Sequence, residues 1–364
     1  MAVIDRLFNY LVENGGSDLH LAEGYVPKAR VHGSVIEIPN EPVLDHDTLH
    51  SMLSEICDPK AYAHYLESGD LDFAYEMDAD SRFRCNYLKQ SRGLAAVFRL
   101  IPNKIIPLEK LGVPEVAKQF ASMRAGLVLV TGPTGSGKST TLAAIIDYIN
   151  ENYARHIVTI EEPIEFVHPN KKSKITQREV PIQTPNFRQG LKAVLREDAE
   201  IVLVGEMRDY ETISLALTAA ETGLLVFGTL HTNSARKTVD RIIDVFPADQ
   251  QDQARAMLAG SLRGVVAQLL MKRSDQAGRV AVHEILLANS SVSSVIREGA
   301  TQKLTDVITT GRAEGMQFMD DSIWEQLMAG KVSPTEAYLK AIDKNRFKAI
   351  LPPEDQAMTN ASGE

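Results

Sequence analysis

A glycine-rich segment of the chain can hold the phosphates of a nucleotide. Residues 132–139 read G-P-T-G-S-G-K-S, an instance of the pattern G-x-x-x-x-G-K-S. The glycines let the backbone curl so that its N–H groups point at an anion, and the following helix adds positive potential. Lys138 can reach the β- and γ-phosphates, and the Ser139 hydroxyl can ligate magnesium. The segment predicts a site for ATP and Mg²⁺ made by Gly132, Pro133, Thr134, Gly135, Ser136, Gly137, Lys138, Ser139 and Thr140.

Carboxylates follow two other apolar runs of the chain. Glu206 is the first acid after the run I-V-L-V, and it can bind magnesium through water or polarise the attacking water. The segment T-I-E-E-P-I-E supplies Glu161, Glu162 and Glu165 after a second run. Because parallel sheets place ligands beyond the carboxyl ends of their strands, we expect these acids to face the nucleotide. One of them can act as the general base for water.

A histidine and several arginines complete the candidate chemistry. His231 follows an apolar run, where it can contact the γ-phosphate and report its loss, although lone histidines are often structural. Arg208 can couple the site to a neighbouring subunit. Arg82 and Arg84 share one face of a predicted strand, and Arg99 lies on a later strand. They can be arginine fingers acting in trans or surface residues in salt bridges, and the residues alone favour the second interpretation.

The segments that must position these residues alternate short apolar runs with helical patterns. The runs lie at 127–130, 157–160, 201–204 and 225–230. Apolar strands separated by helices indicate a parallel sheet covered on both faces. From about Val292 the pattern is helical, and S-P-T-E at 333–336 is a capping box with proline at the first helical position. The predicted fold class of this part is α/β.

The N-terminal part has a different pattern. A helical segment at the start, three strand-like runs at 71–77, 82–88 and 94–101, and a helical zone before them indicate an α+β domain with an antiparallel sheet. Two prolines within 101–107 disfavour helix and central strand. We predict an N-terminal domain at 1–101, a linker at 102–112, an ATPase core at 113–290, a helical C-terminal region at 291–351 and a disordered tail at 352–364.

The composition is that of an ordinary globular protein of about two domains. The chain has 364 residues, of which 44% are hydrophobic and 24% charged. Its two cysteines, Cys57 and Cys85, lack metal-site spacing and fit a reducing cytoplasm. No apolar run has the length of a membrane span. The net charge of −9 and 6% aromatic residues argue against nucleic acid as a partner. We expect a cytoplasmic protein without membrane insertion.

Four segments in this order resemble the secretion-ATPase superfamily, and within it the PilT group of type IV pilus retraction motors. The resemblance covers nearly the whole chain, from G-S-D-L-H-L at 16–21 to G-M-Q at 315–317. The segments are similar to the family's Walker A motif (132–141), Asp box (159–165), Walker B region (195–209) and His box (219–232).

The resemblance implies a PAS-like N-terminal domain, a RecA-like ATPase domain and a homo-hexameric ring. It implies that Glu165 is the catalytic glutamate, that Glu206 is the Walker B acid, and that N-terminal arginines reach the phosphates. The implied function is a mechanical ATPase that powers retraction of type IV pili and twitching motility. The implied partners are the platform protein of the pilus machine, at the cytoplasmic side of the inner membrane, and a paralogous retraction ATPase.

Three positions depart from the family pattern. Glu162 replaces an aspartate of the Asp box, Leu224 replaces the first histidine of the His box, and residues 291–299 match the string A-I-R-x-L-I-R-E-G only in their second half. The last two departures leave open an accessory motor of the PilU type.

Other functions remain as alternatives. Assembly ATPases of the superfamily usually carry a tetracysteine zinc motif and an extra N-terminal domain, and we expect neither here, with two cysteines and a P-loop at residue 132. A nucleic-acid translocase would need a basic, aromatic-rich channel. A regulatory subunit without turnover is disfavoured by the intact Lys138, Ser139, Glu165, Glu206 and His231.

Overall fold

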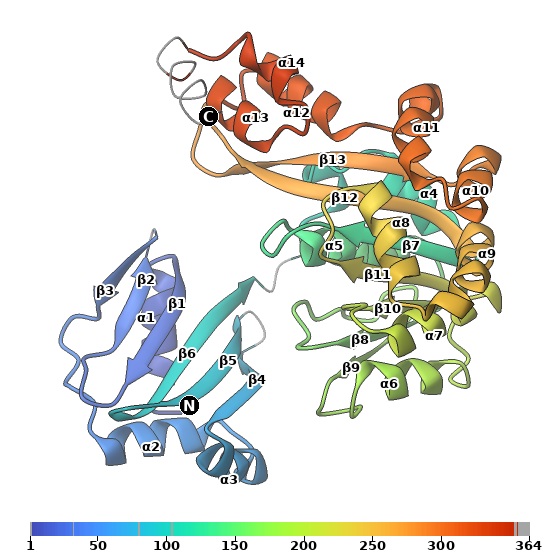
Figure 1. Cartoon of the computed structure of the whole chain (residues 1–364). Helices are drawn as coiled ribbons and strands as arrows, with labels where there is room; N and C mark the ends of the chain where they lie inside the picture. The colour runs from blue at the N-terminus through green and yellow to red at the C-terminus, as the bar shows by residue number, and fades with distance from the viewer. Residues whose placement is uncertain (1, 32, 79–80, 103–104, 353–354, 356–364) are drawn as a thin grey trace. The chain divides into compact units, whose positions relative to one another are not determined.

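The chain folds into two compact units. The computed structural model describes residues 2–31, 33–78, 81–102, 105–352 and 355 (Figure 1). The first unit comprises the residues up to Ile105 together with Pro163–Val167, and the second comprises Ile106–Glu162 and the residues from His168 onward. Most of the predicted tail at 352–364 lies outside the described residues, as do residues 103–104 of the predicted linker.

The first unit is an antiparallel sheet packed on three helices. Its strands lie in the order β3-β2-β1-β6-β5-β4, and every neighbouring pair is antiparallel. The predicted α+β character of this part is confirmed. The elements are α1 (Asp5–Glu13), β1 (Gly16–Ala22), β2 (Lys28–Val31), β3 (Ser34–Glu37), α2 (His46–Glu55), α3 (Pro59–Ser68), β4 (Asp70–Asp78), β5 (Ser81–Gln90) and β6 (Gly93–Pro102).

Strand β5 shows why the arginines of this unit face outward. Phe83, Cys85 and Tyr87 alternate along the strand and are fully buried in the core. The ring of Phe83 stacks on Phe8 of α1 with 4.1 Å between centroids. Because successive side chains of a strand point to opposite faces, Arg82 and Arg84 lie on the other face, as the sequence predicts.

The second unit alternates strands and helices and ends in a helical region. Its strands are β7 (Gly126–Thr131), β8 (His156–Glu161), β9 (Lys174–Glu179), β10 (Ile201–Val204), β11 (Leu225–Leu230), β12 (Leu262–Lys272) and β13 (Arg279–Leu287). Its helices are α4 (Val116–Ser122), α5 (Lys138–Asn152), α6 (Phe187–Val194), α7 (Tyr210–Glu221), α8 (Ala235–Asp244), α9 (Gln251–Ser261), α10 (Ser290–Arg297), α11 (Leu304–Thr310), α12 (Met319–Met328), α13 (Pro334–Lys340) and α14 (Lys344–Lys348). One-turn 3₁₀ helices lie at Leu108–Lys110, Ala248–Gln250, Thr301–Lys303 and Gly311–Glu314.

The sheet of the second unit is parallel except at one edge. Its order is β13-β12-β7-β11-β10-β8-β9, and only β13 runs antiparallel to its neighbour. Helices α4 and α5 cover one face, and α6 to α10 cover the other (Figure 1). Every residue of β7, β10 and β11 is buried, which confirms the predicted α/β fold. The sequence patterns do not predict β9, β12 or β13, whose runs mix polar with apolar residues.

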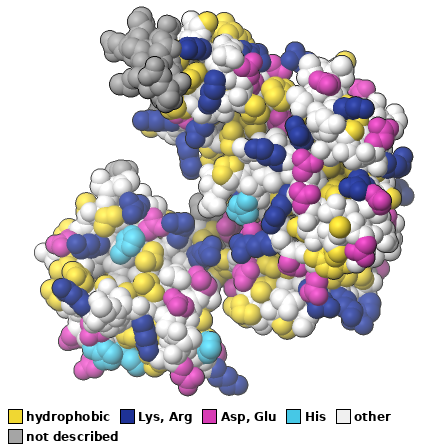
Figure 2. Space-filling model, in the orientation of Figure 1, with side chains coloured by type: hydrophobic (Ala, Val, Ile, Leu, Met, Phe, Trp, Pro, Cys, Tyr) yellow, Lys and Arg dark blue, Asp and Glu magenta, His cyan; other side chains and the backbone are white. Residues whose placement is uncertain are grey.

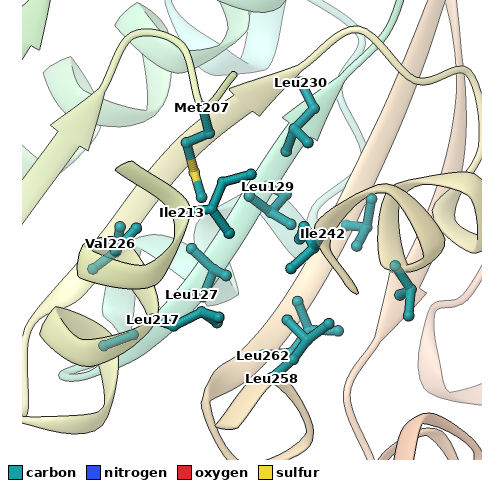
Figure 3. Close-up of a cluster of buried hydrophobic side chains, with 14 of the residues drawn as sticks. Leu127, Leu129, Met207, Ile213, Leu217, Val226, Leu230, Ile242, Leu258 and Leu262 are labelled. Atoms are coloured by element: carbon teal, nitrogen blue, oxygen red, sulfur yellow. The ribbon is translucent and has the colours of Figure 1, made fainter. Parts of the chain in front are cut away.

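A large apolar cluster fixes the face of the sheet under α7, α8 and α9 (Figure 3). Leu127 and Leu129 project from β7 toward Ile213 and Leu217 of α7. Burying each of these side chains stabilises the fold by about 1.5–3 kcal/mol relative to exposure. The cluster therefore holds the central strands, whose ends carry the candidate site, in one arrangement.

The C-terminal helices pack on the β12–β13 pair through a separate small core, which includes Met271, Val282 and Phe347. Ser333 caps α13 by accepting a hydrogen bond from the Glu336 N–H, as the capping box predicts. Among the helices that the structure describes, none has the length and apolar character of a membrane span.

Two buried histidines of the second unit predict that acid weakens the fold. Burial lowers the pKa of His283, on β13, and of His168 to about 4. Between the ordinary pKa of about 6.5 and this lowered value, only the unfolded chain takes up the proton. The contribution of each histidine to the free energy of unfolding is therefore complete above the ordinary pKa. It falls by about 1.4 kcal/mol per pH unit as the pH drops toward 4.

We expect His283→Leu to make the fall in unfolding free energy between pH 6 and pH 4 shallower by about 1 kcal/mol per pH unit. Urea unfolding followed by the fluorescence of Trp324, the single tryptophan, measures it in this unit. His64→Leu, at an exposed position, is the matched control and keeps the wild-type slope. Equal slopes in all three proteins would contradict the role of His283.

Candidate nucleotide site

The P-loop joins the buried strand β7 to helix α5. Gly132 and Gly137 have φ angles of +147° and +88°, in the region that favours glycine. A Cβ atom at Gly132 would lie 2.3 Å from the backbone oxygen of Gln268, so this position also has no room for a side chain. The segment therefore takes the curled conformation that its glycines predict.

Lys138, the first residue of α5, turns back over this loop. Its Nζ donates to the backbone oxygens of Gly132 at 2.9 Å and Pro133 at 3.1 Å. The side chain of Ser136 is buried beneath, and its hydroxyl has no hydrogen-bond partner among the described residues. The loop thus presents an ammonium group, helix N–H groups and an unsatisfied hydroxyl, which are groups that phosphate oxygens can satisfy.

The structure brings Glu206, Arg208 and His231 together at the neighbouring strand ends. Glu206 follows β10, and its carboxylate accepts hydrogen bonds from the Arg208 guanidinium, with 2.5 Å to the second oxygen. The Nε2 atom of His231, which follows β11, lies 3.0 Å from the same carboxylate. The Glu206 side chain is 19% exposed, against 73% for Arg208 and 46% for His231. A largely enclosed acid is therefore flanked by a more exposed guanidinium group and a more exposed imidazole.

These contacts keep Glu206 ionised. Partial burial acts to raise the pKa of Glu206, but hydrogen bonds and charge from Arg208 and His231 act more strongly in the other direction. Its pKa therefore lies below the ordinary value for a glutamate. The Arg208 pKa is raised by the same pairing. A glutamate with a lowered pKa is ionised at neutral pH, and such an oxygen donor is suited to bind a hydrated cation or orient water.

Met207 anchors the loop that carries this cluster. Its side chain is buried among Ile213 and Leu129 (Figure 3), and its N–H donates to the Thr229 oxygen at 3.0 Å. Its sulfur would lie 2.3 Å from a Cβ atom at Gly228, so glycine there leaves the space that the methionine fills. Because Met207 points into the core, the charged residues on either side of it stay at the surface.

Hydroxyl groups connect the His231 loop to the P-loop strand. The Thr232 hydroxyl lies 2.6 Å from that of Thr238 on α8, which donates to the Ser234 backbone oxygen at 2.8 Å and lies 3.4 Å from the Thr131 hydroxyl. Thr131 is the residue before Gly132. The loop that carries His231 is thus tied to the start of the P-loop, a contact that no sequence motif reveals.

The three acids at the end of β8 and in the segment after it have different surroundings. Glu161 is engaged, since its carboxylate accepts from the Thr159 hydroxyl at 2.6 Å and from the Gln177 amide at 3.1 Å. Glu162 is exposed. Glu165 lies in the stretch grouped with the first unit, and its half-exposed side chain makes no hydrogen bond or ion pair within the described chain. Glu162 and Glu165 thus both keep a carboxylate that can accept a proton from water.

The N-terminal arginines lie on the outer face of their sheet in ion pairs with acids of their own unit. Arg82 pairs with Glu76 at 3.5 Å and Arg84 with Asp72 at 3.9 Å, across β4 and β5. Arg99 of β6 stands opposite Arg84 and pairs with Asp18 at 2.8 Å. Of the three pairs, only Arg84–Asp72 is exposed at both ends, and exposed pairs contribute only about 0–1 kcal/mol.

Two further residues contact the P-loop from outside every motif. Gln268 of β12 hydrogen-bonds both the loop and α5. An Arg279 nitrogen on β13 lies 3.5 Å from the Gly135 oxygen. The available sequence signal for Gln268 is a single amide within the apolar run V-V-A-Q-L-L. Arg279 has no comparable signal.

Comparison with known proteins identifies the family. The sequence profile described as "Type II/IV secretion system protein" matches residues 3–340. The chain belongs to this family. It is 48% identical over 338 residues to the type IV pilus retraction ATPase PilT of Pseudomonas aeruginosa, covering 93% of this chain and 98% of that one. It is 50% identical to a twitching motility protein of Neisseria gonorrhoeae, covering 86% and 84%.

A solved structure supports the same assignment. The crystal structure of the pilus retraction motor PilT with bound ADP superposes with a TM-score of 0.88 at 38% identity, covering 95% of this chain and 98% of that one. The family resemblance, the fold class and the ATPase class predicted from the sequence are confirmed. The chain is also 35% identical over 347 residues to the type IV pilus ATPase PilU of Pseudomonas aeruginosa, covering 95% of this chain and 91% of that one.

Proposed function

We propose that this family member hydrolyses ATP to power the retraction of type IV pili. The observation that supports it most is the coincidence of a complete P-loop with the Glu206–Arg208–His231 cluster at adjacent strand ends, in a chain close to half identical to a retraction ATPase. The proposed nucleotide contacts are residues 132–140, with Lys138 offsetting charge on the transferred phosphoryl group.

Magnesium fits this site through two oxygen donors. Mg²⁺ in such sites takes one or two protein ligands, several waters and substrate phosphates, and it neutralises charge as the phosphoryl group moves. The Ser139 hydroxyl stands one residue after Lys138, and the ionised Glu206 can reach the ion through water. Carboxylate oxygens have capacity beyond the contacts with Arg208 and His231.

We propose roles in hydrolysis for three further side chains. We assign Glu165 as the general base that takes a proton from the attacking water. Glu206 would hold the hydrated ion through water, and His231 would contact the γ-phosphate. The Thr232–Thr238–Thr131 contacts give the His231 loop a direct connection to the P-loop strand when the γ-phosphate leaves.

We propose a homo-hexameric ring that works at the cytoplasmic side of the inner membrane. Its partners are the pilus platform protein and a paralogous retraction ATPase. Arg82, Arg84 and Arg99 act as cationic fingers on the nucleotide of a neighbouring subunit. The geometry favours Arg84 and Arg99, whose side chains are 47% and 70% exposed against 13% for Arg82.

An accessory motor like PilU is the second candidate, and the surroundings of Leu224 bear on it. Leu224 precedes β11 and packs against the apolar cluster. His231 follows the opposite end of the same strand. Leucine at position 224 therefore lies at the far end of β11 from the His231 cluster, which is intact. This favours a principal motor with its own turnover.

Glu165 and Glu206 should separate by role. We expect Glu165→Gln to keep ATP binding and lose turnover by roughly 10²-fold or more, since only the base is removed. Glu206→Gln should also raise the Mg²⁺ concentration needed for half-maximal turnover. Phosphate release and nucleotide-binding assays measure both effects. Glu13→Gln, at an exposed position at the end of α1, is the control, and wild-type turnover in Glu165→Gln would move the base elsewhere.

Mixed rings test the arginines. Lys138→Ala subunits and Arg84→Ala subunits should each be nearly inactive alone. In mixtures, an intact P-loop of one subunit meets an intact arginine of its neighbour, so ATPase activity should recover in part. The same holds for Arg99→Ala. Arg92→Ala, an exposed arginine of the β5–β6 turn, should remain active by itself. No recovery at any mixing ratio would count against action in trans.

Deleting the gene tests the direction of work. We expect the strain to carry more pili than the parent, with pili that no longer shorten, when labelled pili are followed by fluorescence microscopy. Cells without pili would indicate an extension motor. Unchanged pilus number and dynamics would indicate an accessory motor. Restoring retraction with wild-type protein but not with Lys138→Ala provides the control.

A further inference from the structure

Gln268 is a buried polar residue next to the P-loop. It lies on β12, where the preceding residue Ala267 pairs with Thr131, the last residue of β7. Gln268 is only 3% exposed although its neighbours along the strand are apolar. Burying a side-chain amide costs free energy unless both its donor and its acceptor form hydrogen bonds. The hydrogen bonds of Gln268 therefore indicate its role.

The side-chain amide of Gln268 connects the two halves of the phosphate-binding segment. Its Nε2 donates to the backbone oxygen of Ser136 at 2.6 Å. Its Oε1 accepts from the hydroxyl of Thr141, in the first turn of α5, at 2.8 Å. One rigid planar group thus sets the distance between the loop and the helix that follows it.

The loop is also shaped around Gln268. The backbone oxygen of Gln268 would be 2.3 Å from a Cβ atom at Gly132, and its Nε2 would be 2.8 Å from one at Gly137. Two of the glycines of the motif therefore have a packing reason besides backbone conformation, since both approach the same residue of β12.

We propose that Gln268 is a positioning residue of the nucleotide site: it orients the Ser136 peptide and the first turn of α5, and so aims the N–H groups that hold the β-phosphate. The inference rests on the proposed nucleotide function. Glutamine suits the position because its amide group has both a hydrogen-bond donor and an acceptor. Methionine has a side chain of similar length but no amide group. The opposite face of β12 carries Ala267 and Met271 in the core of the C-terminal helices. The strand therefore links that region to the P-loop.

The test compares ADP with AMP in the full chain. In Gln268→Met the affinity for ADP should fall about tenfold, because two buried hydrogen bonds that fix the loop are lost. The affinity for AMP, which has no β-phosphate, should stay within about twofold, so the preference for ADP over AMP shrinks. Isothermal titration measures both. A role in stability alone would weaken both nucleotides equally and would overturn the proposal.

Three variants make the result decisive. Thr141→Val removes one of the two contacts of Gln268 and should lower the affinity for ADP about threefold. In a protein that already carries Thr141→Val, Gln268→Met should lower this affinity by a smaller factor, because the two substitutions remove the same contact. Met271→Leu, on the opposite face of β12, should leave ADP affinity unchanged. If Gln268→Met does not fold, the ratio of ADP affinity to AMP affinity in Thr141→Val tests the proposal instead. Wild-type protein that fails to bind ADP would refute the nucleotide function itself, whereas wild-type binding with unchanged variants would refute only the role of Gln268.

Discussion

The burial of the central strands on both faces is the constraint on which the rest of this structure depends. Strands β7, β10 and β11 expose no residue to solvent, and helices pack against each side. Side chains within such strands must be apolar or satisfied, so charged groups can be placed only where the strands end. Because the strands are parallel, those ends share one edge. The P-loop, Glu206 and His231 lie at successive ends of this edge for that reason.

The charged cluster at this edge combines a fixed component with exposed ones. Met207 holds the loop by its buried side chain, and Glu206 is largely enclosed, while Arg208 and His231 reach it from outside. The hydrogen bonds and charge of these neighbours lower the pKa of Glu206. Its partners Arg208 and His231 are exposed enough to exchange one contact for another. Figure 2 shows acidic and basic side chains interspersed over the visible face, so the surface shown has no single basic band.

The β12–β13 pair extends the site beyond the parallel core. Glu284 of β13 accepts a hydrogen bond from the Ala235 N–H, at the start of α8, at 2.7 Å, while Gln268 of β12 contacts the P-loop from the other face. The two strands thus contact both the segment that follows the His231 loop and the segment that holds the phosphates. The C-terminal helices also pack on this pair. The P-loop, the start of α8 and the C-terminal helices therefore all contact the same two strands.

The sequence by itself determined the features that depend on local order: the P-loop, the apolar strands that end at Glu206 and His231, the capping of α13 and the outward face of Arg82 and Arg84. Each rests on spacing along a few residues, which backbone geometry converts directly into position. Only the tertiary structure decided which strands neighbour one another, that Arg208 and His231 share Glu206, and that Gln268 lies under the loop. Gln268 is more than 120 residues from Ser136 in sequence, and no local pattern encodes a contact that forms only when β12 pairs with β7. The sequence patterns do not predict strands β9, β12 and β13 for the same reason. Their polar side chains form hydrogen bonds with residues far away in the sequence.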